Sequence, residues 1–452
     1  MSRQLPPGWA MVPLGNVGRW TGGGTPSKAE QGFWNNGTVP WVSPKDMKIP
    51  VLHRAEDYIT EAAVRGSATR IVEPGSVLVV TRSGILQRTL PVAINAVPVT
   101  LNQDLKAITP IDGIDARFLY WLLIWQGSDI LRTCAKAGTT VASVETSRLQ
   151  GLEVPIAPLS EQRRIVAVLE EYLSDLDAAV AGLERARANT QRYLRSLIEK
   201  RVTDLVSNGP LEPLRHVVRL LDQGWSPQCD RSVASADEWG VIKTTAVQPL
   251  RFLPAANKRL PARLAPRPAL SLRAGDLLVT RAGPRSRVGI SCVVTEDQSR
   301  LMNCDKVYRV QLHAQLARPE YIAIVLNSPS YLRRLDDLKS GISDSGVNLT
   351  QDRFLDLVVP LPPIGLQDDM LTDVALRKAM VEHAVNDIDV QLARSARLRQ
   401  AILHRAFTGK LVSQDGKDQP ASAPLGRIRG EDAIRPAPAP RPRGRPRATS
   451  SR

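Results

Sequence analysis

The stretch from Glu161 to Leu205 most constrains how this chain can fold, because it predicts a single long helix. It contains no proline, and its only glycine is Gly182. A leucine recurs every seventh residue, with Thr190 in the one remaining slot, at Leu169, Leu176, Leu183 and Leu197. A seven-residue apolar repeat keeps one seam facing a partner helix and favours a left-handed coiled coil. At roughly 65 Å the helix is far longer than an average globular helix, which favours a coiled coil over the alternative of an amphipathic helix lying on a core.

A partner helix is predicted in the same chain, between Leu366 and Leu411, because the same pattern recurs there. An offset of 205 residues carries the seam onto Val374, Val381, Ile388, Ser395 and Ile402. The preceding segments also match, since RLQGLEVPIAPLSEQ from Arg148 aligns with RFLDLVVPLPPIGLQ from Arg353. A repeat of about 200 residues indicates a duplicated domain and not a solenoid of short repeats.

Further correspondences between the two halves are weaker but collinear. TPSK from Thr25 aligns with SPQC from Ser226, WVSPKDM from Trp41 with VIKTTAV from Val241, and PGSVLVVTRSG from Pro74 with AGDLLVTRAG from Ala274. The predicted order is a first domain (1–156), a long helix (157–208), a second domain (209–361), a second long helix (362–411) and a basic tail (412–452).

Each domain is predicted to mix short strands with helix. In the first domain, SVLVVT (76–81) and LKAIT (105–109) are short apolar runs between turns rich in Gly, Pro and Asn, which is typical of strands. Residues 115–136 are apolar nearly all round, which indicates a buried helix. The predicted fold class is therefore α+β, with two tandem α/β domains and two long helices that pair with each other.

The charge of the chain points to an anionic partner. A net charge of +15 and a pI near 10.0 favour nucleic acid, although ribosomal and membrane-surface proteins are also this basic. No apolar run reaches membrane-spanning length, and MSRQLPPGWA does not resemble a signal sequence, so we expect a cytoplasmic protein. The four cysteines lack CxxC spacing, which predicts unpaired thiols and no metal site.

Candidate DNA-binding residues of the first domain lie where predicted strands end in loops. They are Lys45, Thr81, Arg82 and Ser83. Arg and Lys can bond guanine edges in the major groove, and Ser or Thr can bond phosphate or base. For Arg82 the alternative is an ordinary surface ion pair. Its counterpart Arg281 follows an equivalent strand, which favours a functional role because ion pairs need not recur at matched sites.

The second domain offers candidates in the loops KTTAVQP, TRAGPRSR and NCDKVYRV. They are Lys243, Thr244, Thr245, Arg281 and Arg285, with Arg287 and Lys306 close by in sequence. The alternative for most of them is plain surface charge. The two domains share a frame and differ in these loops, as expected if each recognises a different target.

The tail from Val412 is rich in Pro, Ala and Arg, and we expect it to be disordered. RPRGRPR from Arg441 contains an AT-hook-like core with Arg443 and Arg445. Such a segment can enter a narrow A·T minor groove. Non-specific attraction to phosphate, or no role in DNA binding, are the alternatives.

Catalytic signatures are missing from the sequence. We find no phosphate-binding GxxxxGK[ST] loop, no HExxH, no dinucleotide fingerprint and no Asn-Pro-Pro-aromatic run of the kind that amino-methyltransferases use. The chain is therefore predicted to bind and not to catalyse.

This architecture resembles the DNA-specificity subunit of type I restriction–modification enzymes. The resemblance covers residues 1 to about 411 and is carried by LPPGWAMVPLGNV, VPIAPLSEQRRIVAVLEEYLSDLDAAV and LRQAILHRAFTGKLV. One departure is Leu366, which stands where the first copy has Glu161 before the shared glutamine. The tail lies outside the family pattern.

The resemblance implies two target-recognition domains, each for one half of a split, asymmetric DNA sequence, on two helices that pair antiparallel about a pseudo-twofold axis. It also implies docking of two methyltransferase subunits and room for two restriction subunits. S-adenosylmethionine, ATP and Mg²⁺ would be used by those partners and not by this chain. The rival hypotheses are a basic DNA-binding scaffold or regulator unrelated to restriction, and a standalone nuclease or methyltransferase.

Overall fold

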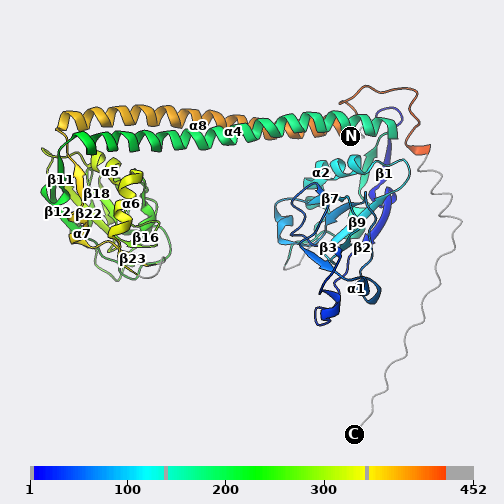
Figure 1. Ribbon diagram of the computed structural model, residues 1–452, viewed down its shortest axis with the longest axis horizontal. Coiled ribbons are helices and arrows are strands. Elements are labelled where there is room, and N and C mark those ends of the chain that lie inside the picture. The colour runs from blue at the N-terminus through cyan, green and yellow to red at the C-terminus, as the bar shows by residue number, and fades with distance from the viewer. Residues whose placement is uncertain (1–4, 137–140, 342–345, 424–452) are drawn as a thin grey trace, which may run out of the picture. The chain divides into compact units, whose positions relative to one another are not determined.

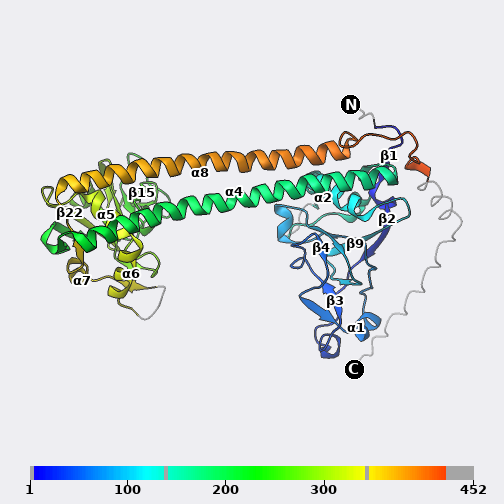
Figure 2. The same cartoon turned by 45° about the horizontal axis from the view of Figure 1, so that its top comes forward.

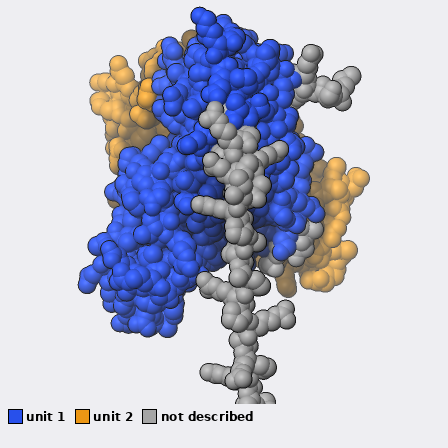
Figure 3. Space-filling model, turned by 90° about the vertical axis from the view of Figure 1, so that its right-hand side faces the viewer, with its two compact units in different colours: residues 1–181, 392–452 blue, residues 182–391 orange. Residues whose placement is uncertain are grey.

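The computed structural model describes residues 5–136, 141–341 and 346–423 and shows an α+β protein with two compact units. Unit 1 contains Met1–Ala181 and Leu392–Arg452, and unit 2 contains Gly182–Gln391, as coloured in Figure 3. Each unit combines one α/β domain with parts of the two long helices, α4 (Leu159–Asn208) and α8 (Ile364–Phe407). The predicted fold class is confirmed.

Unit 1 is built around two small sheets (Figure 1). Its strands are β1 (Ala10–Pro13), β2 (Gly18–Gly22), β3 (Val39–Val42), β4 (Val51–Leu52), β5 (Asp57–Ile59), β6 (Val77–Val80), β7 (Val92–Asn95), β8 (Thr100–Leu101), β9 (Leu105–Pro110) and β10 (Glu153–Ile156). Its shorter helices are α1 (Glu61–Gly66), α2 (Ala116–Thr133) and α3 (Thr146–Gln150). The sheets have the orders β2-β9-β6-β7-β4 and β5-β3-β8, and β1 pairs with β10.

The core of unit 1 forms where β6 meets α2. All four residues of β6 are fully buried, because β9 and β7 pair with its two edges and apolar side chains cover both faces. Phe118, Leu122 and Ile130 of α2 are also fully buried, and Asp115 caps the helix by accepting from the Phe118 amide. The strand and the buried helix predicted from the sequence are both present.

Unit 2 repeats this topology. Its strands are β11 (Leu211–Pro213), β12 (Val218–Gln223), β13 (Gly240–Ile242), β14 (Val247–Gln248), β15 (Arg251–Phe252), β16 (Asn257–Arg259), β17 (Ser271–Leu272), β18 (Leu277–Thr280), β19 (Ala282–Gly283), β20 (Ser291–Val293), β21 (Gln298–Met302), β22 (Val307–Leu312), β23 (Val347–Asn348) and β24 (Val358–Pro360). Its shorter helices are α5 (Pro319–Asn327), α6 (Pro329–Leu338) and α7 (Gln351–Leu355).

The strand order shows that the two domains are copies. The larger sheet of unit 2 has the order β12-β22-β18-β20, which matches β2-β9-β6-β7 of unit 1. In the smaller sheets, β13 pairs antiparallel with β16 and parallel with β21, just as β3 pairs with β5 and β8. The internal repeat inferred from the sequence is therefore confirmed at the level of strand topology.

The copies differ at the sheet edges, where β4 and β17 have no counterparts in the matching sheets, and in the helix that follows the larger sheet. The position of the continuous helix α2 is taken in unit 2 by two helices, α5 and α6, which are separated at Ser328. Pro329 has no amide hydrogen, and the Ser328 hydroxyl caps the second helix by accepting from the Tyr331 amide. A single Ser-Pro pair thus accounts for the break.

The two long helices pair antiparallel, and they lie side by side in Figures 1 and 2. In unit 2, Arg187 pairs with Asp389 at 3.2 Å and Arg201 pairs with Asp373 at 3.2 Å. The residue number rises along α4 while that of its partner falls along α8, so the chains run in opposite directions. In unit 1, Asp177 pairs with Arg399.

The seam residues predicted from the heptads are all shielded from solvent in part or in full. Leu169, Leu176 and Val374 are buried, and the half-buried ones are Leu183, Leu197, Val381, Ile388 and Ile402. Burial is deepest where a domain also covers the helix. Leu169 and Leu176 belong to the core of unit 1, whereas Val374 belongs to the core of unit 2.

A buried glutamine fastens each domain to the start of its long helix. Gln162 Nε2 donates to the carbonyls of Gly113 (2.9 Å) and Ala157 (2.8 Å), and its Oε1 accepts from the Asp115 amide at 2.8 Å.

Gln367 makes the same set of bonds in unit 2. Its Nε2 donates to the carbonyls of Leu316 (2.9 Å) and Pro362 (2.8 Å), and its Oε1 accepts from the Arg318 amide at 2.9 Å. Both side chains are 0% exposed. The recurrence of one network in both copies explains why glutamine stands at both positions.

The neighbouring position is where the copies diverge. Glu161 is buried, accepts from Trp9 Nε1 at 3.1 Å and from Gln414 Nε2 at 3.3 Å, and has its pKa raised by burial. Leu366, its counterpart, is 55% exposed. Unit 2 therefore keeps the glutamine network without the acidic residue.

We predict that Gln162→Ala and Gln367→Ala each lower the free energy of unfolding of their own unit by about 2–4 kcal/mol, because buried carbonyl and amide groups lose their partners. Thermal or urea denaturation of the full chain measures this. Gln191→Ala is the matched control, since Gln191 is exposed on α4. Equal stability of Gln162→Ala and Gln191→Ala would contradict the assigned role.

Candidate nucleic-acid interface

The first candidate surface lies where the central strand of each larger sheet ends. In unit 1, the amides of Thr81 and Arg82 both donate to the carbonyl of Asp104, at 2.7 and 3.2 Å. In unit 2, the Arg281 amide donates to the carbonyl of Lys306 at 2.9 Å. The Ala282 amide donates to the same carbonyl at 3.4 Å, so the same backbone turn follows β6 and β18. Val77–Val80 and Leu277–Thr280 pair in matching registers, which places Arg281 at the position of Thr81 and Ala282 at that of Arg82. The equivalence of Arg82 and Arg281 predicted from the sequence is therefore wrong by one residue, because the alignment shifted the strand.

A second segment crosses this end of the sheet in both units. A side chain at Gly23 would overlap the carbonyl of Asn102, and one at Gly224 would overlap the carbonyl of Asn303, so only glycine fits. The Thr25 hydroxyl donates to Gln103 and the Ser226 hydroxyl to Asp305. The matched TPSK and SPQC motifs therefore hold these segments against the turn beside the two arginines.

Arg82 and Arg281 also have different environments. Arg82 is exposed, and its guanidinium has no hydrogen bond or ion pair to any part of the chain that the structure describes. Arg281 is half-buried, donates from Nη1 to the Asp305 carbonyl at 3.0 Å, and lies 5.5 Å from the centre of the Tyr308 ring. Burial raises the pKa of the Tyr308 phenol. Among the described residues, Arg281 is therefore engaged in packing, whereas Arg82 has no side-chain partner.

The hydroxyl candidates of unit 1 serve local structure. Thr81 is buried and donates to the carbonyl of Asp104 at 3.1 Å. Ser83 accepts from the Ile85 amide at 3.4 Å and caps the short helix that follows. These contacts position the turn that presents Arg82.

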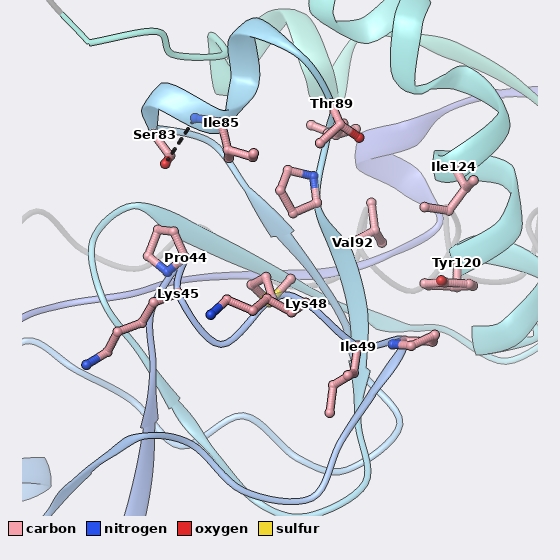
Figure 4. Close-up of a pocket in the computed structure, with 14 residues that line it drawn as sticks. Pro44, Lys45, Lys48, Ile49, Ser83, Ile85, Thr89, Val92, Tyr120 and Ile124 are labelled. Atoms are coloured by element: carbon pink, nitrogen blue, oxygen red, sulfur yellow. Dashed lines mark hydrogen bonds between the residues drawn. The ribbon is translucent and has the colours of Figure 1, made fainter. Parts of the chain in front are cut away.

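The loop after β3 and the turn after β6 line opposite sides of a groove of about 660 Å³, shown in Figure 4. Lys45 and Lys48 lie on one side and Ser83 on another, with Ile124 of α2 on the apolar wall. Lys45 Nζ pairs with Glu56 at 3.1 Å and with Asp57 at 3.0 Å, and the hydrogen bonds that it donates to Asp57 and then to Glu56 raise its pKa. Lys48 is exposed and was not singled out from the sequence.

The corresponding loop of unit 2 carries three candidates. Lys243 precedes a short 3-10 helix that begins at Thr244. Lys243 and Thr244 are half-buried, and Thr245 is exposed.

Two further cations of unit 2 lie on other loops. Arg285 is ion-paired with Asp336 at 3.0 Å. Lys306 is exposed and lacks a side-chain partner among the residues described. The structure thus separates cations available to a ligand from those held by acidic neighbours.

Two of the predicted DNA-binding residues, Arg443 and Arg445, lie outside the described residues. Within the ranges that are described, no group of three or more His, Cys, Asp or Glu side chains is arranged to hold a metal ion. None of the described helices combines the length and apolarity that crossing a membrane requires.

Comparison with known proteins agrees with this architecture. Residues 6–183 match the family described as "Type I restriction modification DNA specificity domain". The chain is 42% identical over 188 residues to the Type I restriction enzyme EcoR124I/EcoR124II specificity subunit of Escherichia coli, and this match covers 41% of the chain and 46% of that relative.

Solved structures match over more of the chain. One, from work on complex assembly and conformational transition of the type I R-M system, covers 90% of this chain and 100% of its own, with 19% identity and a TM-score of 0.68. Another, the HsdS subunit from Thermoanaerobacter tengcongensis, covers 91% and 99%, with 18% identity and a TM-score of 0.52. Both share the fold.

The fold therefore defines a class of proteins that carry tandem α/β domains on paired long helices. Residues 6–183 are similar to the type I restriction modification DNA specificity domain. The matched segment spans less than half the length of the Escherichia coli relative. The rival hypothesis of a basic scaffold unrelated to restriction finds no support in these relatives.

We predict effects of different size for Arg281 and Arg82. Arg281→Ala should lower the free energy of unfolding by about 1–3 kcal/mol, because the partly buried Asp305 carbonyl and the Tyr308 ring lose a partner. Arg82→Ala should change it by less than about 0.5 kcal/mol, since the side chain is exposed. Thermal denaturation of both variants measures the difference. An equal effect of the two substitutions would contradict the distinction.

Proposed function

We propose that this chain is the non-catalytic DNA-specificity subunit of a type I restriction–modification complex. The single observation that carries the proposal is a duplicated domain, equal in strand topology and unequal in its loops, on a chain whose first half matches the DNA specificity family. Equal scaffolds with unlike loops suit a split target whose two halves differ in sequence.

Double-stranded DNA is the proposed ligand. The chain carries a net charge of +15, and exposed cations such as Arg82, Lys48 and Lys306 lie on the loops that follow the sheets. Electrostatic attraction to phosphate supplies affinity, whereas base-edge contacts supply specificity. Because each mismatched base pair costs about 1–3 kcal/mol, two small domains together discriminate far better than one.

The long helices are the proposed spacer and docking surface. A helix of 50 residues such as α4 is about 75 Å long, and its pairing with α8 stiffens it. The complex would contain two methyltransferase subunits and accept two restriction subunits. Those partners would use S-adenosylmethionine, ATP and Mg²⁺. Because the complex would act on chromosomal DNA, we expect the protein in the cytoplasm.

The first test is biochemical and genomic. Co-expression with a methyltransferase subunit, sought among the neighbouring genes, should give a stable complex, and methylome sequencing should reveal a two-part motif that disappears when the gene is deleted. A chain that methylates or cleaves DNA without partners would favour a standalone enzyme. A methylome unchanged by the deletion would contradict the proposal.

The second test concerns the spacer. Deleting one heptad from each helix, Arg185–Gln191 together with Val385–Gln391, removes facing segments because Arg187 pairs with Asp389. The seam stays in register, and the helices shorten by about 10 Å, so the gap between the half-sites should shrink by about three base pairs. Methylome mapping measures this. Changed half-site bases at an unchanged gap would count against the spacer role.

A further inference from the structure

The loop after the central strand of each smaller sheet is held in place by one charged side chain, and the two units use different devices. The loops are residues 43–48 after β3 in unit 1 and residues 243–248 after β13 in unit 2. They occupy the same place in the topology, since β3 and β13 have matching partners. They also carry the candidates Lys45, Lys243 and Thr245.

In unit 1 the device is internal to the loop. Asp46 Oδ2 accepts from the amide of Ser43 at 2.8 Å and from its hydroxyl at 3.0 Å. Asp46 Oδ1 accepts from the Glu56 amide at 2.7 Å, which ties the loop to the segment leading into β5. One carboxylate thus satisfies three donors and closes the turn that presents Lys45 and Lys48.

In unit 2 the equivalent position is Ala246, which has no polar side chain to close the loop. Arg287 takes over this task from the turn between β18 and β20. Its Nη2 donates to the carbonyls of Thr244 at 2.9 Å and Val247 at 2.6 Å, and its Nε is buried. The guanidinium bridges two segments that in unit 1 face each other across the open groove of Figure 4.

Arg287 is itself rigidly placed. Its amide donates to the carbonyl of Pro284 at 2.8 Å, and its carbonyl accepts from the Thr280 hydroxyl. The Arg287 backbone is held by its own turn, and its Nη2 atom binds the carbonyls of Thr244 and Val247 at the two ends of one short helix. Arg287 therefore fixes the backbone of the loop that it binds. Arg287 points into the protein here and does not project from the loop surface.

We propose that Asp46 and Arg287 are positioning residues for target recognition, each setting the conformation of the recognition loop of its own unit. This inference rests on the proposed function. Base discrimination in the first half-site would depend on the loop that the Asp46 carboxylate closes. Base discrimination in the second half-site would depend on the loop that the Arg287 guanidinium holds. Two unlike devices let the two loops take different conformations on one scaffold, so the half-sites differ without a change of fold.

The experiment uses the full chain in complex with its methyltransferase and duplexes that carry the methylome-derived target or a single mismatch in one half-site. Arg287→Ala should reduce discrimination against mismatches in the second half-site about tenfold, comparable to one lost base contact, and leave the first unchanged. Asp46→Ala should do the reverse. Arg273→Ala and Asp112→Ala are the matched controls, because both side chains are exposed.

Salt dependence separates positioning from direct contact. A residue that touches phosphate changes the slope of log K against log salt by about 1 when it is removed. Arg287→Ala should leave that slope unchanged, and a fall of about 1 would overturn the positioning role. Arg287→Lys and Asp46→Asn, which retain part of the bonding, should recover part of the discrimination, and they serve if an alanine variant fails to fold.

The outcomes also separate this inference from the function on which it rests. A wild-type complex that shows no two-part target would overturn both. A wild-type complex with such a target, and variants that lose thermal stability while discrimination in both half-sites stays intact, would overturn only the positioning role.

Discussion

The antiparallel pairing of α4 and α8 is the constraint on which the rest of the structure depends. One apolar stripe on each helix faces the partner helix, and near each domain the same helices also contribute to a core, as Leu169 does in unit 1 and Val374 in unit 2. The domains are therefore packed directly on the helices and not attached by a flexible linker. Burial of the same residues stabilises both the helix pair and the domains on it.

The two units show which parts of the scaffold tolerate no change and which are open to variation. The glutamine networks of Gln162 and Gln367 and the glycines at 23 and 224 recur because a buried polar group needs its partners and a close backbone approach excludes a Cβ. Around this shared frame, the helix following the larger sheet is continuous in one unit and broken in the other, and the loops after β3 and β13 are fixed by unlike charged groups. The copies thus vary around the sheets while the central strand order is kept.

Arg82 and Arg281 illustrate why sequence alignment alone misassigns such surfaces. The alignment matched them, but the strand registers place Arg281 at the position of Thr81. The guanidinium of Arg281 packs near the Tyr308 ring, whereas that of Arg82 has no partner among the described residues. Lys45, another candidate, is occupied by Glu56 and Asp57, which follow it by about ten residues. Whether a cation is available depends on neighbours that are distant in sequence.

The amino-acid sequence by itself determined the duplication, the two long helices with their seam, and the buried strand and helix of the first domain's core. These follow from periodicity and local chemistry, which need no knowledge of distant contacts. Only the tertiary structure decided which charged side chains are free, that Gln162 and Gln367 fasten domain to helix, and that Asp46 and Arg287 hold corresponding loops. Each of those roles arises from partners brought together by folding, such as Arg287 and Thr244, which lie 43 residues apart in the chain.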